Sequence, residues 1–255
     1  HLTLSLVAER ESEPNVFRRE AQGGRLIVAR RLAPRTVATF SLDAERASVL
    51  AAPAVLCAAF LVCLPDDIQE LARPRWTKVA GLGWIKEGTD RAVAPTDGYI
   101  ARASLAWAAP WLASDLDFIR GTLEGARYID LQRERVLALR ARFGSVFGTA
   151  TLQPGDDFLP PDQRFYAGGA NSVRGFRRNE LGPVVYVAEG PVFDPDNVQS
   201  VAVGGTTVAV LNAEYRAPSP FASDLLRIAV FVDAGMLSAS QAFPFARGWR
   251  VTPGI

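Results

Sequence analysis

Residues 165–176 read FYAGGANSVRGF and form the most informative stretch of this chain. A single arginine, Arg174, lies among three glycines, which are Gly168, Gly169 and Gly175. Because glycine tolerates positive φ, we expect the segment to fold back sharply and to present Val173 and Arg174 at its tip. An arginine in such a position needs partners, and these must come from other parts of the chain.

The sequence on both sides of this stretch alternates apolar and polar residues with a period of two. In residues 2–9, for example, Leu2, Leu4 and Leu6 share one face, and polar residues occupy most of the other. This period indicates β-strands with one apolar face. The clearest predicted strands are 2–9, 38–45, 99–107, 137–144, 207–216 and 228–235, weaker ones are 25–31, 77–88 and 117–131, and 251–255 looks like the opening of another.

Two all-β architectures fit this alternation, a soluble antiparallel sandwich and a transmembrane β-barrel. Every apolar stretch is interrupted before the ~20 residues that a transmembrane helix needs, whereas a transmembrane strand needs only ~10 alternating residues. The predicted connections favour the barrel, because short turns near 33–35, 94–98 and 133–135 alternate with long connections at 46–75 and 148–204. Outer-membrane barrels have short turns at one rim and long loops at the other.

Charged and aromatic residues are compatible with a barrel as well. Glu45, Arg140 and Arg142 occupy the face opposite the apolar one, as a watery lumen allows. Aromatic residues near predicted strand ends could form interfacial girdles, although packing in a soluble core would also explain them. These residues are Trp76, Trp84, Trp107, Trp111 and Phe118.

The composition argues against several functional classes. The 28 basic residues are scattered among 27 acidic ones, so the basic surface expected of a nucleic-acid-binding protein is missing. The only histidine is His1, which leaves a Ser-His-Asp or Cys-His site without a base. With two cysteines and one histidine, a zinc-type metal site is not expected. We therefore expect no enzymatic activity, no metal and no cofactor.

Cys57 and Cys63 are the only cysteines, and both lie in the long connection at 46–75. If this connection faces an oxidising compartment, a local disulfide is expected. The alternative is a pair of buried free thiols.

Two carboxylates are placed to meet Arg174. Glu214 and Asp233 both fall on the polar, lumen-facing side of their predicted strands. An arginine that is partly desolvated inside a barrel needs carboxylates in a forked, charge-assisted geometry. We therefore expect Arg174 to reach Glu214 and Asp233.

These features together resemble the BamA/TamA superfamily of outer-membrane β-barrel assembly proteins, also called the bacterial surface antigen family. The segment from Gly168 to Phe176 is similar to the signature of that family's sixth extracellular loop. In the family, the loop arginine is held inside the barrel by an acidic residue of the next strand and by the aspartate of an aromatic-x-Asp-x-Gly motif on the following strand. Glu214 and Asp233 occupy the matching positions.

The resemblance implies a transmembrane antiparallel β-barrel of sixteen strands in the bacterial outer membrane. Residues 1–255 would form a partial barrel domain of about strands five to thirteen, with 46–75 and 148–204 as extracellular loops. The chain has no initiating methionine or signal peptide, and we expect it to be a fragment of a longer protein with periplasmic POTRA domains upstream.

The function implied is folding and insertion of β-barrel proteins into the outer membrane. The expected partners are outer-membrane lipids, unfolded β-barrel clients and, in addition, periplasmic chaperones and accessory lipoproteins. Two alternatives remain open, a two-partner-secretion polypeptide transporter of the same superfamily and a structural barrel that anchors a fused surface or enzymatic domain. In each case Arg174 is hypothesised to hold the loop inside the lumen.

Overall fold

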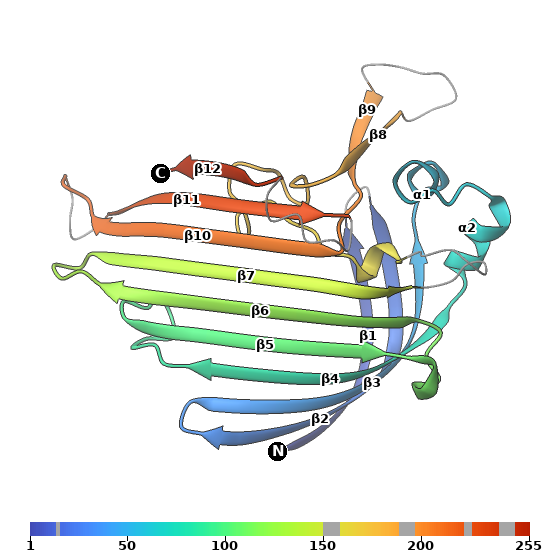
Figure 1. Cartoon of the computed structure of the whole chain (residues 1–255), viewed down its shortest axis with the longest axis horizontal. Coiled ribbons are helices and arrows are strands. Elements are labelled where there is room, and N and C mark those ends of the chain that lie inside the picture. The colour runs from blue at the N-terminus through green and yellow to red at the C-terminus, as the bar shows by residue number, and fades with distance from the viewer. Residues whose placement is uncertain (14–15, 150–158, 189–196, 222–225, 240–247) are drawn as a thin grey trace.

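The structure is a computed structural model that describes residues 1–13, 16–149, 159–188, 197–221, 226–239 and 248–255. Ten strands form one curved antiparallel sheet (Figure 1). They are β1 (Leu2–Glu13), β2 (Phe17–Ala33), β3 (Thr36–Leu50), β4 (Arg75–Glu87), β5 (Gly98–Ala108), β6 (Asp117–Asp130), β7 (Val136–Thr149), β10 (Thr207–Pro218), β11 (Arg227–Ser238) and β12 (Arg250–Gly254).

Each strand of this sheet pairs with the next one in the chain, except that β7 pairs with β10. The chain between them forms a separate hairpin of β8 (Val184–Ala188) and β9 (Val198–Ala202). The antiparallel sheet predicted from the alternation is therefore confirmed, although the fold is mostly β and not all-β, because two helices lie between β3 and β4. The strand expected to open at residue 251 is β12.

The predicted apolar faces lie on the outer side of the curved sheet. Large apolar side chains on this side are exposed, including Leu6, Phe40 and Leu139. On the opposite face, Arg140 and Glu214 contact residues of the long segment after β7. Because successive side chains of a strand point to opposite faces, a continuous apolar wall and a polar interior follow from the period of two.

The connections alternate between a rim with short turns and a rim with long segments. The short connections are 34–35, 88–97, 131–135 and 219–226. The opposite rim carries two α-helices, two short 3-10 helices and the β8-β9 hairpin. These helices are α1 (Pro53–Phe60), α2 (Pro65–Ala72), η1 (Pro110–Leu112) and η2 (Pro161–Gln163). No helix in the described part of the chain is long and apolar enough to cross a membrane.

Several predicted bounds were wrong. The strands β3 and β7 extend beyond residues 46 and 148, so the long connections are 51–74 and 150–206. The tight turn predicted at 94–98 is a connection of residues 88–97 that Asp90 closes by accepting hydrogen bonds from the backbone of Thr96 and Asp97. These bonds, together with one from the Thr96 hydroxyl, hold the pKa of Asp90 well below its usual range.

The second strand was predicted to begin near residue 25, but β2 begins at Phe17. In the first residues of β2, Phe17, Arg19 and Ala21 are buried on the inner face. Charged or polar residues alternate with them on the outer face. The alternation predicts a strand where apolar residues line the outer face. This part of β2 has no apolar outer face, because its apolar residues Phe17 and Ala21 point inward.

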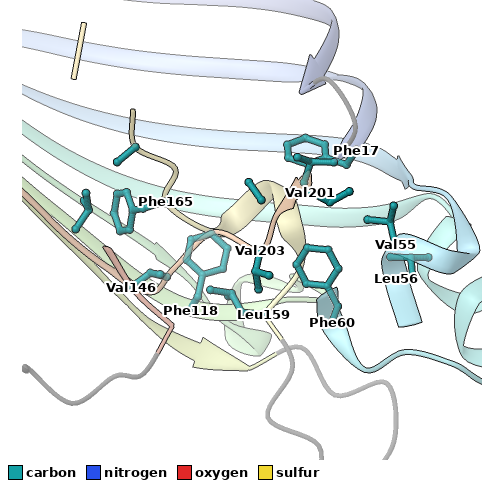
Figure 2. Packing of buried hydrophobic residues seen from close by; sticks show 14 of the residues in the cluster. Phe17, Val55, Leu56, Phe60, Phe118, Val146, Leu159, Phe165, Val201 and Val203 are labelled. Carbon is teal, nitrogen blue, oxygen red and sulfur yellow. The ribbon is translucent and has the colours of Figure 1, made fainter. Parts of the chain in front are cut away.

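The largest group of buried apolar side chains lies inside the long-connection rim (Figure 2). Phe118 and Val146 come from the inner face of the sheet, Phe165 and Val201 from the segment between β7 and β10, and Phe60 from α1. Phe118 is therefore a core residue and not part of an outer girdle, whereas the four tryptophans considered with it are exposed. This core fixes the segment that carries Arg174 against the sheet.

Candidate functional site

Arg174 lies at the centre of the site and uses its guanidinium on two carboxylates. Its Nε donates to Oδ2 of Asp233 at 2.7 Å and its Nη2 to Oδ1 at 2.9 Å, which is a bidentate contact. Its Nη1 donates to Oε2 of Glu214. Its Cζ lies 3.4 Å from the centre of the Phe231 ring, so the flat face of the cation is covered too. The hydrogen bonds to Asp233 and Glu214 raise the pKa of Arg174, which keeps it charged.

Asp233 is fully buried, and its carboxylate accepts four hydrogen bonds. Three come from Arg174, through the backbone N, Nε and Nη2, and the fourth comes from Nδ2 of Asn212 at 2.9 Å. Each carboxylate oxygen accepts two of them, which satisfies the acceptor capacity of the group. A buried charge is tolerated only with such pairing and hydrogen bonding, so Asp233 requires Arg174 as much as Arg174 requires Asp233.

The spacing aromatic-x-Asp-x-Gly has a geometric cause. Phe231, Asp233 and Gly235 are alternate residues of β11 and therefore face the same side. Phe231 covers the guanidinium, Asp233 binds it, and Gly235 leaves room for the neighbouring Val173, which is fully buried. A Cβ at Gly235 would lie 2.5 Å from Cγ2 of Val173.

Four inward residues on four adjacent strands bind the main chain of the loop tip. Arg140 donates to the carbonyl of Asn171 at 2.9 Å, and Asn212 donates to that of Ser172 at 2.8 Å. Asp233 accepts from the backbone N of Arg174, and the hydroxyl of Thr252 donates to its carbonyl. The strand registers place Arg140 opposite Asn212, Asn212 opposite Asp233, and Asp233 opposite Thr252. The sheet thus presents one cross-strand row of polar groups to successive residues of the tip.

The glycines of the signature have the backbone conformation that the sequence suggests. Gly168, Gly169 and Gly175 have φ values of +112°, +90° and +92°. A side chain would be strained at each of them. Phe176, the last residue of the signature, is partly buried against the core, and its carbonyl accepts a hydrogen bond from Gly169 at 3.0 Å. The segment therefore folds back on itself with Val173 and Arg174 turned toward the sheet.

The same long segment also contacts strands on the other side of the sheet. Asp162 of η2 lies 3.4 Å from Nε of Arg19 on β2, and Arg19 also donates to Glu45 on β3. Burial raises the pKa of Asp162, while its hydrogen bond from Gln163 and the charge of Arg19 act in the opposite direction. We call Arg174 with Glu214 and Asp233 the first anchor, and Arg19 with Glu45 and Asp162 the second anchor.

A further contact reaches β1. Glu13 accepts hydrogen bonds from Arg178 and from the side-chain amide of Asn179, both just after the signature. The segment between β7 and β10 is thereby bonded to β1 and β2 as well as to β7, β10, β11 and β12.

Cys57 and Cys63 are joined in a disulfide across the end of α1. Val55, Leu56 and Phe60 of this helix are buried in the core, and the guanidinium of Arg164 lies 4.7 Å from the centre of the Phe60 ring. The disulfide thus closes a helical turn that packs on the segment carrying the signature. Among the described residues, no three or more His, Cys, Asp or Glu side chains gather as a metal site would require.

Sequence reasoning missed several residues of the site. Asn212 lies two residues before Glu214 on β10 and therefore on the same inner face. Its contacts with Ser172 and Asp233 could thus have been predicted from the alternation. Arg140 was predicted to face the lumen but was not assigned a partner. Thr252 and the second anchor had no signal of this kind, because their residues belong to no recognisable motif and Arg19 lies in the part of β2 that was not predicted to be a strand.

Comparison with known proteins gives a consistent result. The family model described as the Omp85 superfamily domain matches residues 1–252. The outer membrane protein assembly factor BamA of Neisseria meningitidis is 30% identical over 162 residues, which is 63% of this chain and 19% of that protein. BamA of Nitratidesulfovibrio vulgaris is 29% identical over 184 residues, which is 70% of this chain and 21% of that protein. The chain thus spans about a fifth of the length of these relatives.

The fold has a counterpart among solved structures. The crystal structure of BamA from Haemophilus ducreyi lacking POTRA domains 1–3 superposes with a TM-score of 0.70 at 20% identity. The match covers 92% of this chain and 46% of that one, so the curved sheet corresponds to part of a BamA barrel. The chain belongs to the Omp85 superfamily and is part of an integral β-barrel of the outer membrane.

Proposed function

We propose that this chain is the barrel portion of an outer-membrane assembly factor that folds and inserts β-barrel proteins, without enzymatic chemistry. Its ten strands would occupy about positions five to fourteen of a sixteen-stranded barrel, and the long connections would face the cell exterior. Two relatives named as outer membrane protein assembly factors support this role.

The observation that carries the proposal is the first anchor. A fully buried Asp233 that receives three hydrogen bonds from one loop arginine holds the tip of the long segment inside the barrel. A client strand must have its backbone groups paired before it enters lipid, and a barrel edge can template that pairing. The anchor would keep the barrel in the conformation that offers such an edge. The partners would be unfolded clients and lipids, with chaperones and accessory lipoproteins in support.

The test is Arg174→Ala in the full-length protein, expressed while the native copy is depleted. Loss of Arg174 leaves Asp233 buried without its cation, so we expect a loss of about 3 kcal/mol in unfolding free energy, near the lower limit for a broken buried pair. Folded client barrels, measured by their temperature-dependent gel mobility, should fall with it. Arg177→Ala is the control, because Arg177 is in the same segment and its side chain is 87% exposed.

A result in which both variants keep equal client levels and equal stability would contradict the proposal. Secretion of a polypeptide through the lumen is the second candidate function, and a structural barrel with a fused domain is the third. Normal client levels with loss of one exported polypeptide in Arg174→Ala would favour the secretion role. Normal levels of both would favour the structural role.

A further inference from the structure

Glu214 of the first anchor binds two cations and not one. Its Oε2 accepts a hydrogen bond from Nη1 of Arg174, and its Oε1 accepts one from Nε of Arg216 at 2.6 Å. Arg216 lies two residues farther along β10 than Glu214, so both side chains point to the inner face, and Arg216 is nearer the rim with short turns. The carboxylate of Glu214 is therefore shared between the loop tip and the barrel wall.

Arg216 has no carboxylate directly opposite it on the neighbouring strands. The residues in those positions are Val136 of β7 and Ala229 of β11. Within the described part of the chain, Glu214 is the only ion-pair partner of Arg216. Because Arg216 belongs to the strand and not to the loop, it remains beside Glu214 when the tip leaves the anchor.

Asp233 has no second cation of this kind. The residues opposite it are Asn212 and Thr252, which are uncharged. Arg174 is the only cation that pairs with Asp233 among the residues that the structure describes. Departure of the tip would thus leave the buried Asp233 without a cation, whereas Glu214 would stay paired.

The shared carboxylate makes the two arginines compete. Two guanidinium groups on one carboxylate repel each other, and each receives only part of the attraction of Glu214. A cavity of about 190 Å³ is lined by residues that include Arg174, Glu214 and Arg216, so Arg216 has room to cover the carboxylate once Arg174 has left. The charge of Arg216 therefore favours the released tip over the docked tip.

We propose that Arg216 is a positioning residue that acts through Glu214 and sets how readily the loop tip leaves the first anchor. Asp233 provides the strong attachment, and the contact with Glu214 is the adjustable one. This role rests on the proposed function, because release of the tip matters only if the barrel with a docked tip is the working form. A purely structural role, in which Arg216 holds Glu214 in place for Arg174, makes the opposite prediction for removal of Arg216.

The test is hydrogen exchange at the backbone N of Arg174, measured by mass spectrometry on the full-length protein in detergent micelles. This amide donates to Asp233 in the docked state, so its exchange requires release of the tip. For Arg216→Gln we expect exchange to slow by about fivefold, the size of one charge interaction at a partly exposed site. Arg216→Lys keeps the charge and should exchange at the parent rate. The matched control is Arg227→Gln, which should also exchange at the parent rate, because Arg227 is 59% exposed near the same rim and pairs with Glu134.

A second comparison tests whether Arg216 acts through Glu214. In a Glu214→Gln background Arg216 is no longer held beside Arg174, so Arg216→Gln should change the exchange rate by less than about twofold. Faster exchange in Arg216→Gln than in the parent, or an equal rate, would overturn the proposal. An undiminished effect in the Glu214→Gln background would overturn it as well. If Arg216→Gln does not fold, Arg216→Ala takes its place in the same comparisons.

The exchange experiment needs no client protein, so its result is separate from that of the client assay. Slower exchange in Arg216→Gln together with normal client levels in Arg174→Ala would reject the proposed function and keep the role of Arg216 in release. Reduced client levels in Arg174→Ala together with unchanged exchange in Arg216→Gln would do the reverse.

Discussion

Val173 and Gly235 show how strongly single residues depend on each other at the first anchor. Val173 is fully buried directly before Arg174, and its Cγ2 occupies the space that a side chain at position 235 would need. The glycine of the aromatic-x-Asp-x-Gly motif therefore serves close packing, and its φ is not in the positive range. Each inward residue of the motif has its own contact with the tip, so changes at the three positions should have distinct effects.

Gly235→Ala tests this packing. We expect a loss of about 1–3 kcal/mol in unfolding free energy, the usual cost of inserting a methyl group into a well-packed site. The additional substitution Val173→Ala should recover part of the loss, because it removes the atom that the new Cβ meets. Urea unfolding in detergent, followed by tryptophan fluorescence, measures both.

Gly125→Ala is the matched control for this pair, because a Cβ at that strand glycine meets nothing within 4 Å. Its stability should stay within about 0.5 kcal/mol of the parent value, as for a surface substitution. If Val173→Ala lowers the stability of Gly235→Ala further, the two residues do not compete for the same space.

At the scale of elements, strand parity was the most reliable guide to the fold. It placed Glu214 and Asp233 on the inner face because the lipid-facing wall imposes a strict period of two on the outer residues. It failed for the beginning of β2, where the outer residues are charged and the apolar contacts of Phe17 are internal. The helices α1 and α2 were not predicted, because α1 packs its buried residues on segments distant in sequence. The second anchor was not predicted because Arg19 lies in that unrecognised part of β2.

The second anchor has an asymmetry that mutation can reveal. Arg19 lies between Asp162 and Glu45, so its removal leaves two carboxylates facing each other without a cation. We expect Arg19→Gln to lower the unfolding free energy by about 3–5 kcal/mol, as for a broken buried ion pair. We expect Asp162→Asn to lower it by less than about 1 kcal/mol. Arg19 still pairs with Glu45 in that variant, and a buried carboxylate with one unpartnered oxygen is no longer desolvated.

Urea unfolding of the two variants in the same detergent separates these cases. Glu20→Gln is a suitable control, because Glu20 is exposed on the outer face of β2 and pairs only with exposed arginines among the described residues. Equal losses for Arg19→Gln and Asp162→Asn would mean that Arg19 does not mediate between the two carboxylates.

At the scale of the whole molecule, the long segment connects strands from both ends of the sheet. The first anchor and Thr252 bind it to β10, β11 and β12, while Glu13 binds it to β1 and the second anchor binds it to β2. The sequence predicted the first of these attachments through a local signature. It could not predict the second, because Glu13 and Arg178 are separated by 165 residues and neither belongs to a recognisable motif.

Two attachments on one segment should act cooperatively. When one is broken, the other keeps the segment close to its site at a high effective concentration, so release requires that both be lost.

We expect Arg174→Ala or Glu13→Gln alone to expose the tip only partly, and the double variant to expose it by more than the product of the two single effects. A cysteine introduced as Val173→Cys reports exposure through its labelling rate with a thiol reagent, because Val173 is fully buried and the two native cysteines are bonded to each other. The combination of Arg174→Ala with Glu20→Gln is the control and should label like Arg174→Ala. If the double variant with Glu13→Gln labels no faster than that control, the contact of Glu13 with the segment does not help to hold the tip in place.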